Sequence, residues 1–221
     1  MRQAAGVEIA ILIFEGLTAL DAVGPYEVLS RVPGARVRFV ATETGAKRTD
    51  NGSLGLVADH ALADVRRPEI VVVSGGFGVR TALGDERVLA WVRDSHVTSR
   101  WTTSVCTGSL LLGAAGILRG LRATTHWRSL ERLREFGAEP VPERVVEQGR
   151  VITAAGVSSG IDMALRLAEL VAGRDVAQAI QLSIEYDPQP PFDAGAPAKA
   201  SPRVRELVDA AYAGRPGPGR G

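Results

Sequence analysis

Short strand-like runs recur along the chain, and each is followed by a segment with helical spacing. Strands are expected at Val7–Phe14, Arg36–Thr42, Glu69–Ser74 and Trp101–Val105. The first and third runs are almost continuously apolar, which is typical of strands buried on both faces of a parallel sheet. Alternation from end to end therefore predicts an α/β fold, with a mostly parallel sheet sandwiched by helices.

Turn residues place the remaining elements. Asn51-Gly52 suits a tight hairpin turn between Lys47–Asp50 and Leu54–Ala58, and Gln148-Gly149 a second one between Glu143–Val146 and Val151–Ala154. A helix over Thr18–Val32 should kink or restart at Gly24-Pro25. Further helices are expected at Thr81–Ser95, Thr107–Leu118, the segment ending at Phe136, Ser158–Val171, Asp175–Tyr186 and Ser201–Ala213.

The chain shows no linker or repeat that would divide it. We expect one domain over residues 1–213 of the 221, followed by a frayed tail over 214–221 that holds only Gly, Pro and Arg. The net charge of +1 argues against a nucleic-acid surface. The start lacks a leader pattern, and the run Ile9–Phe14 is too short to span a bilayer, so a cytoplasmic protein is predicted.

The single cysteine, Cys106, stands where a strand turns directly into a buried helix. A lone cysteine is most often a small core residue. At this corner, however, the thiol would face the helix N-terminus, at the carboxyl edge of the sheet where α/β proteins bind ligands. Gly75-Gly76 ends a second strand, so backbone N–H groups near Gly76 and Thr107 could form an oxyanion hole around a nucleophile elbow.

The N-terminus of the helix alone cannot lower the pKa of the Cys106 thiol far enough. A free cysteine has a pKa of roughly 8.5, and a value near 5.5 requires about 4 kcal/mol of stabilisation of the thiolate. A helix terminus supplies about 0.3–2 kcal/mol. Hydrogen bonds from Thr107, from the backbone or from a protonated acid must supply the rest. Asp21, just after the first strand, is the candidate acid, although a solvated aspartate near a helix start is the other reading. Beside a thiolate its pKa should rise, and it could then pass a proton to a substrate.

Other polar groups are weaker candidates. His126 could pair with Cys106, but packing against Trp127 or a structural hydrogen bond explains it as well. One cysteine and three scattered histidines exclude a disulfide framework and give no metal-ligand spacing. The glycines after Ser74 lack the ending of a phosphate loop. The turn from Gly156 to Ser159 is either a second glycine-rich edge of the pocket or a simple helix entry.

At these residues the chain resembles the ThiJ/PfpI superfamily of the class I glutamine-amidotransferase-like fold, and within it the isonitrile (isocyanide) hydratase branch. The matching stretches are Leu20–Leu29, Val73–Gly76, Ser104–Gly116, Arg122–Trp127 and Glu185–Phe192. The resemblance implies a homodimer of flavodoxin-like subunits without a metal or organic cofactor. It implies Cys106 as the nucleophile, Asp21 as the acid and Thr107 as their neighbour. Much of the superfamily has a glutamate where this chain has Asp21, and the hydratases have an aspartate.

Related transcription regulators share the cysteine and Arg122–Trp127 stretches but carry an added helix-turn-helix domain, which this chain is expected to lack. The hydratase reading predicts that the Cys106 thiolate attacks an isocyanide carbon, that Asp21 relays the proton, and that water releases a formamide from a covalent thioimidate. The alternatives are glyoxalase- or deglycase-like action on α-oxo aldehydes, a cysteine redox sensor, or a ligand-binding domain.

Overall fold

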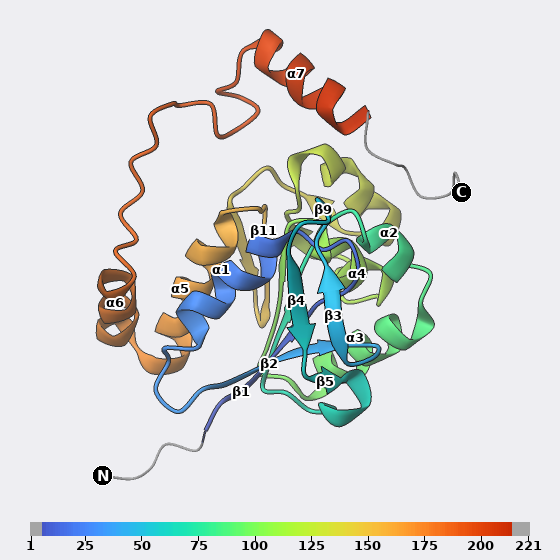
Figure 1. Cartoon of the computed structure of the whole chain (residues 1–221), viewed down its shortest axis with the longest axis vertical. Helices are drawn as coiled ribbons and strands as arrows, with labels where there is room; N and C mark the ends of the chain where they lie inside the picture. Colours follow the sequence, from blue (N-terminus) through green and yellow to red (C-terminus); the bar gives the residue numbers. More distant parts are fainter. Residues whose placement is uncertain (1–5, 214–221) are drawn as a thin grey trace. The chain divides into compact units, whose positions relative to one another are not determined.

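A seven-stranded sheet forms the centre of the computed structural model, which describes residues 6–213 (Figure 1). The strands run in the order β10-β11-β7-β6-β1-β2-β5, and every neighbouring pair is parallel except β10 and β11. Their bounds are β1 Glu8–Leu12, β2 Arg36–Ala41, β5 His60–Ala61, β6 Ile70–Val73, β7 Trp101–Val105, β10 Val145–Gln148 and β11 Val151–Ala154. The predicted mostly parallel sheet is confirmed.

Helices cover both faces of this sheet, because alternate strand residues point to opposite sides. Ile9 and Ile11 of β1 face one apolar core, and Ala10 and Leu12 face the other. The first core includes α1 (Ala19–Leu29), α5 (Ser159–Ala172) and α6 (Arg174–Ser183). The second includes α2 (Val79–Ala82), α3 (Glu86–Thr98), α4 (Gly108–Ala114) and the 3₁₀ helix η2 (Trp127–Phe136).

Both predicted hairpins are present. β3 (Gly45–Arg48) pairs antiparallel with β4 (Gly55–Ala58), and the turn places Gly52 at a φ of 77°. β10 pairs antiparallel with β11 in the second hairpin, and Gly149 in its turn has a φ of 60°. The short elements are η1 (Leu62–Asp64), β8 (Arg122–Ala123) and β9 (Glu139–Pro140).

One helix prediction is wrong. The expected helix over Thr81–Ser95 is two helices, α2 and α3, because the Asp85 carboxylate caps the second one by accepting a hydrogen bond from the Arg87 N–H at 3.0 Å. At Gly24-Pro25 the helix does not restart, because α1 runs on through Pro25. Gly24 lets α5 approach closely, since a Cβ there would lie 3.1 Å from Ile161. Packing against α5 therefore offsets the backbone hydrogen bond that Pro25 removes.

The chain divides into two compact units, one ending at Ile184 and one starting at Glu185. The second contains α7 (Pro202–Ala213), in which no residue is buried. Its predicted start is confirmed, as Ser201 Oγ accepts from the Val204 N–H at 3.3 Å. One domain over 1–213 stays a prediction, and the expected tail at 214–221 lies outside the described residues. Among the described helices, none has the length and apolarity needed to cross a membrane.

Replacing Gly108 with alanine tests how closely α4 meets the sheet. A Cβ at this first residue of α4 would lie 2.2 Å from the Val73 carbonyl oxygen, where backbone cannot yield cheaply. Gly108→Ala should lower the free energy of unfolding by about 2–3 kcal/mol, measured by urea denaturation. Gly84→Ala is the matched control, because its Cβ would meet nothing nearer than 3.5 Å. Equal stability of the two variants would contradict this packing.

Candidate active site

Cys106 occupies a sharp strand-to-helix corner. β7 ends at Val105, Cys106 has a φ of 57°, and Thr107 is the N-cap of α4. The Cys106 N–H donates to the Ala154 carbonyl at 2.9 Å. Its carbonyl accepts from the Thr125 hydroxyl at 2.9 Å and the Ser109 hydroxyl at 3.3 Å. A non-glycine residue at positive φ is costly and persists only where its neighbours hold it, as these three bonds do here.

The turn before α5, from Gly156 to Ser159, packs against Cys106. Gly156 lies so near that a Cβ there would stand 2.4 Å from the Cys106 Cβ. Gly160, in the first turn of α5, would place a Cβ 3.0 Å from Val105. Of the two sequence readings of this turn, the structure favours the one that puts it at the edge of the cysteine site. Cys106 is left with 5% of its surface exposed.

Asp21 lies in the first turn of α1 and is fully buried. Its Oδ2 accepts from the Gly75 N–H at 3.1 Å, and its carboxyl interacts with the Cys106 thiol. No nitrogen or oxygen of the described residues hydrogen-bonds its Oδ1. The Asp21 carboxyl and the Cys106 thiol are therefore neighbours. Few groups around them could stabilise a negative charge on either one.

Burial sets the protonation of this pair. It raises the pKa of Asp21 to about 7, with a contribution from the Asp50 carboxylate, against the opposing hydrogen bonds from Cys106 and Gly75. Burial and the charge of Asp21 also raise the pKa of the Cys106 thiol, and hydrogen bonds from Thr107 lower it only in part. The lowered thiol pKa expected from the sequence is thus wrong, because burial and a like charge outweigh the helix N-terminus.

The two raised pKa values describe one coupled system. Two buried anions side by side are costly, so the pair keeps one proton over the interval between its two titrations. Within that interval the proton is on sulfur or on oxygen, and moving it between them leaves the net charge of the pair unchanged. A thiolate is reached here by internal transfer rather than by loss of a proton to solvent.

The glycine doublet fits between the acid and the threonine. A Cβ on Gly75 would lie 2.6 Å from the Thr107 N and 2.9 Å from Asp21 Oδ2. The Gly76 N–H donates to the Thr107 hydroxyl oxygen at 2.9 Å, and that hydroxyl is 3.2 Å from the Gly76 carbonyl. Both doublet N–H groups are thus engaged in holding Asp21 and Thr107. Their role as oxyanion donors stays a prediction, and a substrate atom would have to replace one of these bonds.

The remaining candidate residues, Thr125 and His126, follow β8 in the chain. The Thr125 hydroxyl donates to the Cys106 carbonyl, which is a structural role. The His126 ring packs tilted against Trp127 at 5.8 Å between centroids, and burial lowers its pKa. Within residues 6–213, no group of three His, Cys, Asp or Glu side chains could hold a metal ion.

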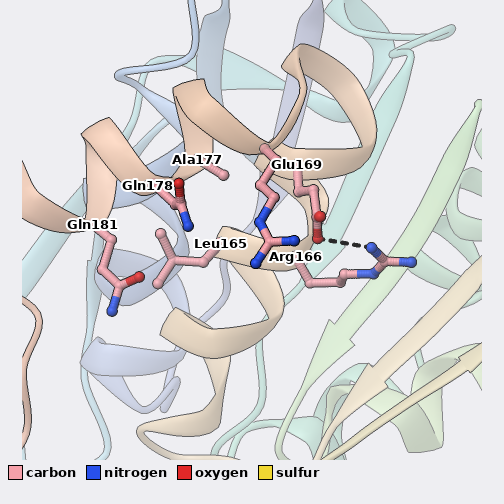
Figure 2. A pocket seen from close by; sticks show the side chains of 7 residues that line it. Leu165, Arg166, Glu169, Ala177, Gln178 and Gln181 are labelled. Carbon is pink, nitrogen blue, oxygen red and sulfur yellow. Dashed lines mark hydrogen bonds and ion pairs between the residues drawn. The ribbon is translucent and has the colours of Figure 1, made fainter.

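A pocket of about 420 Å³ lies elsewhere, between the later turns of α5 and α6 (Figure 2). Polar side chains line it, and the Arg166 guanidinium donates to the Glu169 carboxylate at 2.8 Å across its rim. None of the sequence-predicted site residues is among its lining residues. It holds no nucleophile, so we do not assign the chemistry of the site to it.

Comparison with known proteins places the chain in a family. The DJ-1/PfpI family model matches residues 7–170. The chain is 42% identical to the isonitrile hydratase of Pseudomonas putida, over 90% of this chain and 86% of that protein. The crystal structure of a ThiJ/PfpI family protein from Pseudomonas syringae has a TM-score of 0.91 at 35% identity, covering 96% of this chain and 88% of its own. Drosophila melanogaster DJ-1beta shares the fold, with a TM-score of 0.74 at 21% identity over 81% of this chain and 98% of its own.

Replacing Asp21 with asparagine tests the protonation of the buried pair through stability. The folded pKa of about 7 lies above the ordinary value of 3.8, so the native state keeps a proton that the unfolded state releases. The resulting stabilisation is complete below pH 3.8 and is lost as pH rises through about 7. At about 1.4 kcal/mol per pKa unit it amounts to roughly 4 kcal/mol at most.

Asp21→Asn should therefore remove most of the decline in unfolding free energy between about pH 4 and pH 8, measured by denaturant titration at several pH values. Asparagine still offers an oxygen to the Gly75 N–H, so the bond at 3.1 Å is kept. Parallel stability curves for the wild type and the variant would show that Asp21 ionises like an exposed aspartate.

Proposed function

The chain belongs to the DJ-1/PfpI family, and from this premise we propose that it hydrates isocyanides (isonitriles) to N-substituted formamides, using Cys106 as nucleophile and Asp21 as proton carrier. The observation that carries the proposal is the buried contact between these two groups, together with 42% identity to an isonitrile hydratase. An isocyanide carbon accepts a nucleophile but needs a proton to complete the addition. A thiol and a carboxyl that share one proton can supply both.

In the first step, transfer of the shared proton to Asp21 leaves a thiolate, which forms a bond to the terminal carbon. Asp21 then gives its proton to the same carbon, and a covalent thioimidate results. The carboxylate is now the general base for the second half of the reaction. Its buried position keeps it basic, because the pKa of Asp21 is near 7 rather than near 4.

In the second step, water adds its oxygen to the thioimidate carbon while Asp21 accepts one of its protons. Asp21 passes that proton to the nitrogen and then takes the hydroxyl proton as the carbonyl forms. The carbon–sulfur bond breaks, and its electron pair returns to Cys106. The products are a formamide and the original pair with one proton, so every atom of water is accounted for.

Thr107 assists at the sulfur. Its backbone N–H and its hydroxyl both lower the pKa of the thiol, which means that both stabilise the thiolate form. Because the hydroxyl also lies within hydrogen-bond distance of the Gly76 carbonyl, it can turn toward sulfur as charge develops there. We assign no metal or organic cofactor to the reaction. Homodimeric assembly, substrate contacts from Gly75 and Gly76, and a cytoplasmic location stay predictions.

Turnover of an alkyl isocyanide by three forms of the protein tests the mechanism. Wild type should yield the formamide, followed by NMR. Cys106→Ala and Cys106→Ser should lose roughly three orders of magnitude or more in kcat, because neither can form the thioimidate. Asp21→Asn should lose on the order of 10²–10⁴-fold, since proton transfer to carbon then has no donor. Formamide production by Cys106→Ala at the wild-type rate would refute the covalent route.

A parallel incubation with methylglyoxal separates the rival functions. A glyoxalase-like enzyme would consume the aldehyde and leave the isocyanide, whereas we expect the reverse. A redox sensor would turn over neither and would gain mass on peroxide treatment. Gln178→Ala, in the pocket between α5 and α6, is the control and should leave isocyanide turnover unchanged, because that pocket is not the proposed site.

A further inference from the structure

The segment that leads from β1 into α1 is held between two other parts of the chain. Leu17 forms a parallel bridge with Thr49 and an antiparallel bridge with Gly76. On one side, the Asp50 N–H donates to the Leu17 carbonyl at 2.8 Å. On the other, the Thr18 N–H donates to the Gly75 carbonyl at 3.0 Å. The hairpin of β3 and β4 is thereby joined through this segment to the backbone that contacts the reacting pair.

Asp50 is the charged residue at this junction. It is half-buried at the end of the hairpin, and its Oδ2 accepts a hydrogen bond from the Thr18 hydroxyl at 2.7 Å. Thr18 is the N-cap of α1, and its carbonyl accepts from the Asp21 N–H at 3.1 Å. Thr18 therefore binds the Asp50 carboxylate through its side chain and the first turn of α1, which carries Asp21, through its backbone.

We propose that Asp50 is a positioning residue whose fixed negative charge, tethered by Thr18, keeps one proton on the pair formed by Asp21 and Cys106. The inference rests on the proposed function of that pair. Asp50 touches no reacting atom and acts through the field that it places on Asp21. The hairpin of β3 and β4, which has no part in the central sheet, then has a role in the chemistry.

Electrostatics supports this assignment. The charge of Asp50 raises the pKa of Asp21, alongside the larger effect of burial. The other titratable group that faces Asp21 is Cys106, from the corner after β7. On α5, which packs against α1, Asp162 and Arg166 are each ion-paired, with Arg144 and with Glu147 and Glu169 respectively. Glu15, beside the junction, accepts a hydrogen bond from the Arg48 N–H at 3.0 Å.

The sign of the effect follows from the charge. A neighbouring anion disfavours every step in which the pair becomes more negative, so it moves both titrations of the pair to higher pH. Removing that anion should move both to lower pH. A purely structural role for Asp50 would change the stability or the amplitude of activity, but it would leave the midpoints where they are.

The test is the pH dependence of Cys106 alkylation by iodoacetamide, which reads the proton of the pair without any isocyanide. In Asp50→Asn the midpoint should fall by roughly half a pH unit, so that alkylation below the wild-type midpoint is about threefold faster. Asp50→Glu keeps the charge and should restore the wild-type midpoint. Asp59→Asn removes an equal charge from the exposed end of β4 and should have no effect.

Both limbs of the pH profile of isocyanide hydration should move with the alkylation midpoint. Absence of hydration by the wild type, with the alkylation shift intact, would reject the proposed function and leave the role of Asp50 standing. An unshifted midpoint in folded Asp50→Asn overturns the role of Asp50.

Thr18→Val keeps the carboxylate and removes its tether, so a smaller shift in the same direction is expected even if Asp50→Asn does not fold. An unshifted midpoint in folded Thr18→Val would equally overturn the proposal.

Discussion

The rest of this structure is arranged around the contact of a buried carboxyl with a buried thiol. Asp21 is fully buried and Cys106 nearly so, and neither has a cation beside it among the groups that shift its pKa. Two such groups cannot both be charged without a large cost, and the pair therefore retains a proton that either atom can hold. In the proposed reaction this constraint makes the two acids one unit, which supplies both the nucleophile and the proton.

Backbone rather than side chains brings the pair together. A Cβ on Gly75 would lie 2.6 Å from the Thr107 N and 2.9 Å from Asp21 Oδ2, and a Cβ on Gly156 would lie 2.4 Å from the Cys106 Cβ. Gly108 lets α4 start directly against the end of β6, with its Cβ position only 2.2 Å from a carbonyl oxygen. Side chains at these three positions would push apart the backbone segments around the acid and the thiol. The positive φ of Cys106 fits the same arrangement, because hydrogen bonds from three different segments hold it in place.

The sequence indicated those features that depend on local pattern. Apolar runs located β1 and β6 to within a few residues, and Asn51-Gly52 located a hairpin, because burial on two faces and a tight turn both restrict composition locally. The neighbourhood of Asp21 and Cys106 followed from one topological rule, that parallel strands bring their carboxyl ends to one edge. The sequence analysis missed the break at Asp85, although Gly84-Asp85 before a helical segment is a local signal for a helix start. The features that the sequence analysis missed depend on burial and on contacts between distant parts of the chain. The thiol pKa rises because the site is closed. The charge that acts on Asp21 comes from Asp50, which is 32 positions from its partner Thr18 in the chain.

A raised thiol pKa fits the chemistry better than the lowered one that the sequence suggested. A low pKa increases the fraction of thiolate but weakens each thiolate as a nucleophile, by about threefold per pKa unit. An isocyanide carbon is a reluctant electrophile and gains from a strongly basic sulfur. In this pair the fraction of thiolate is set by proton transfer to Asp21, whose own pKa has been raised to about 7. Burial thus raises the pKa of the thiol as well as that of the carboxyl, so in the proposed reaction the thiolate that forms on transfer of its proton to Asp21 is a strongly basic nucleophile.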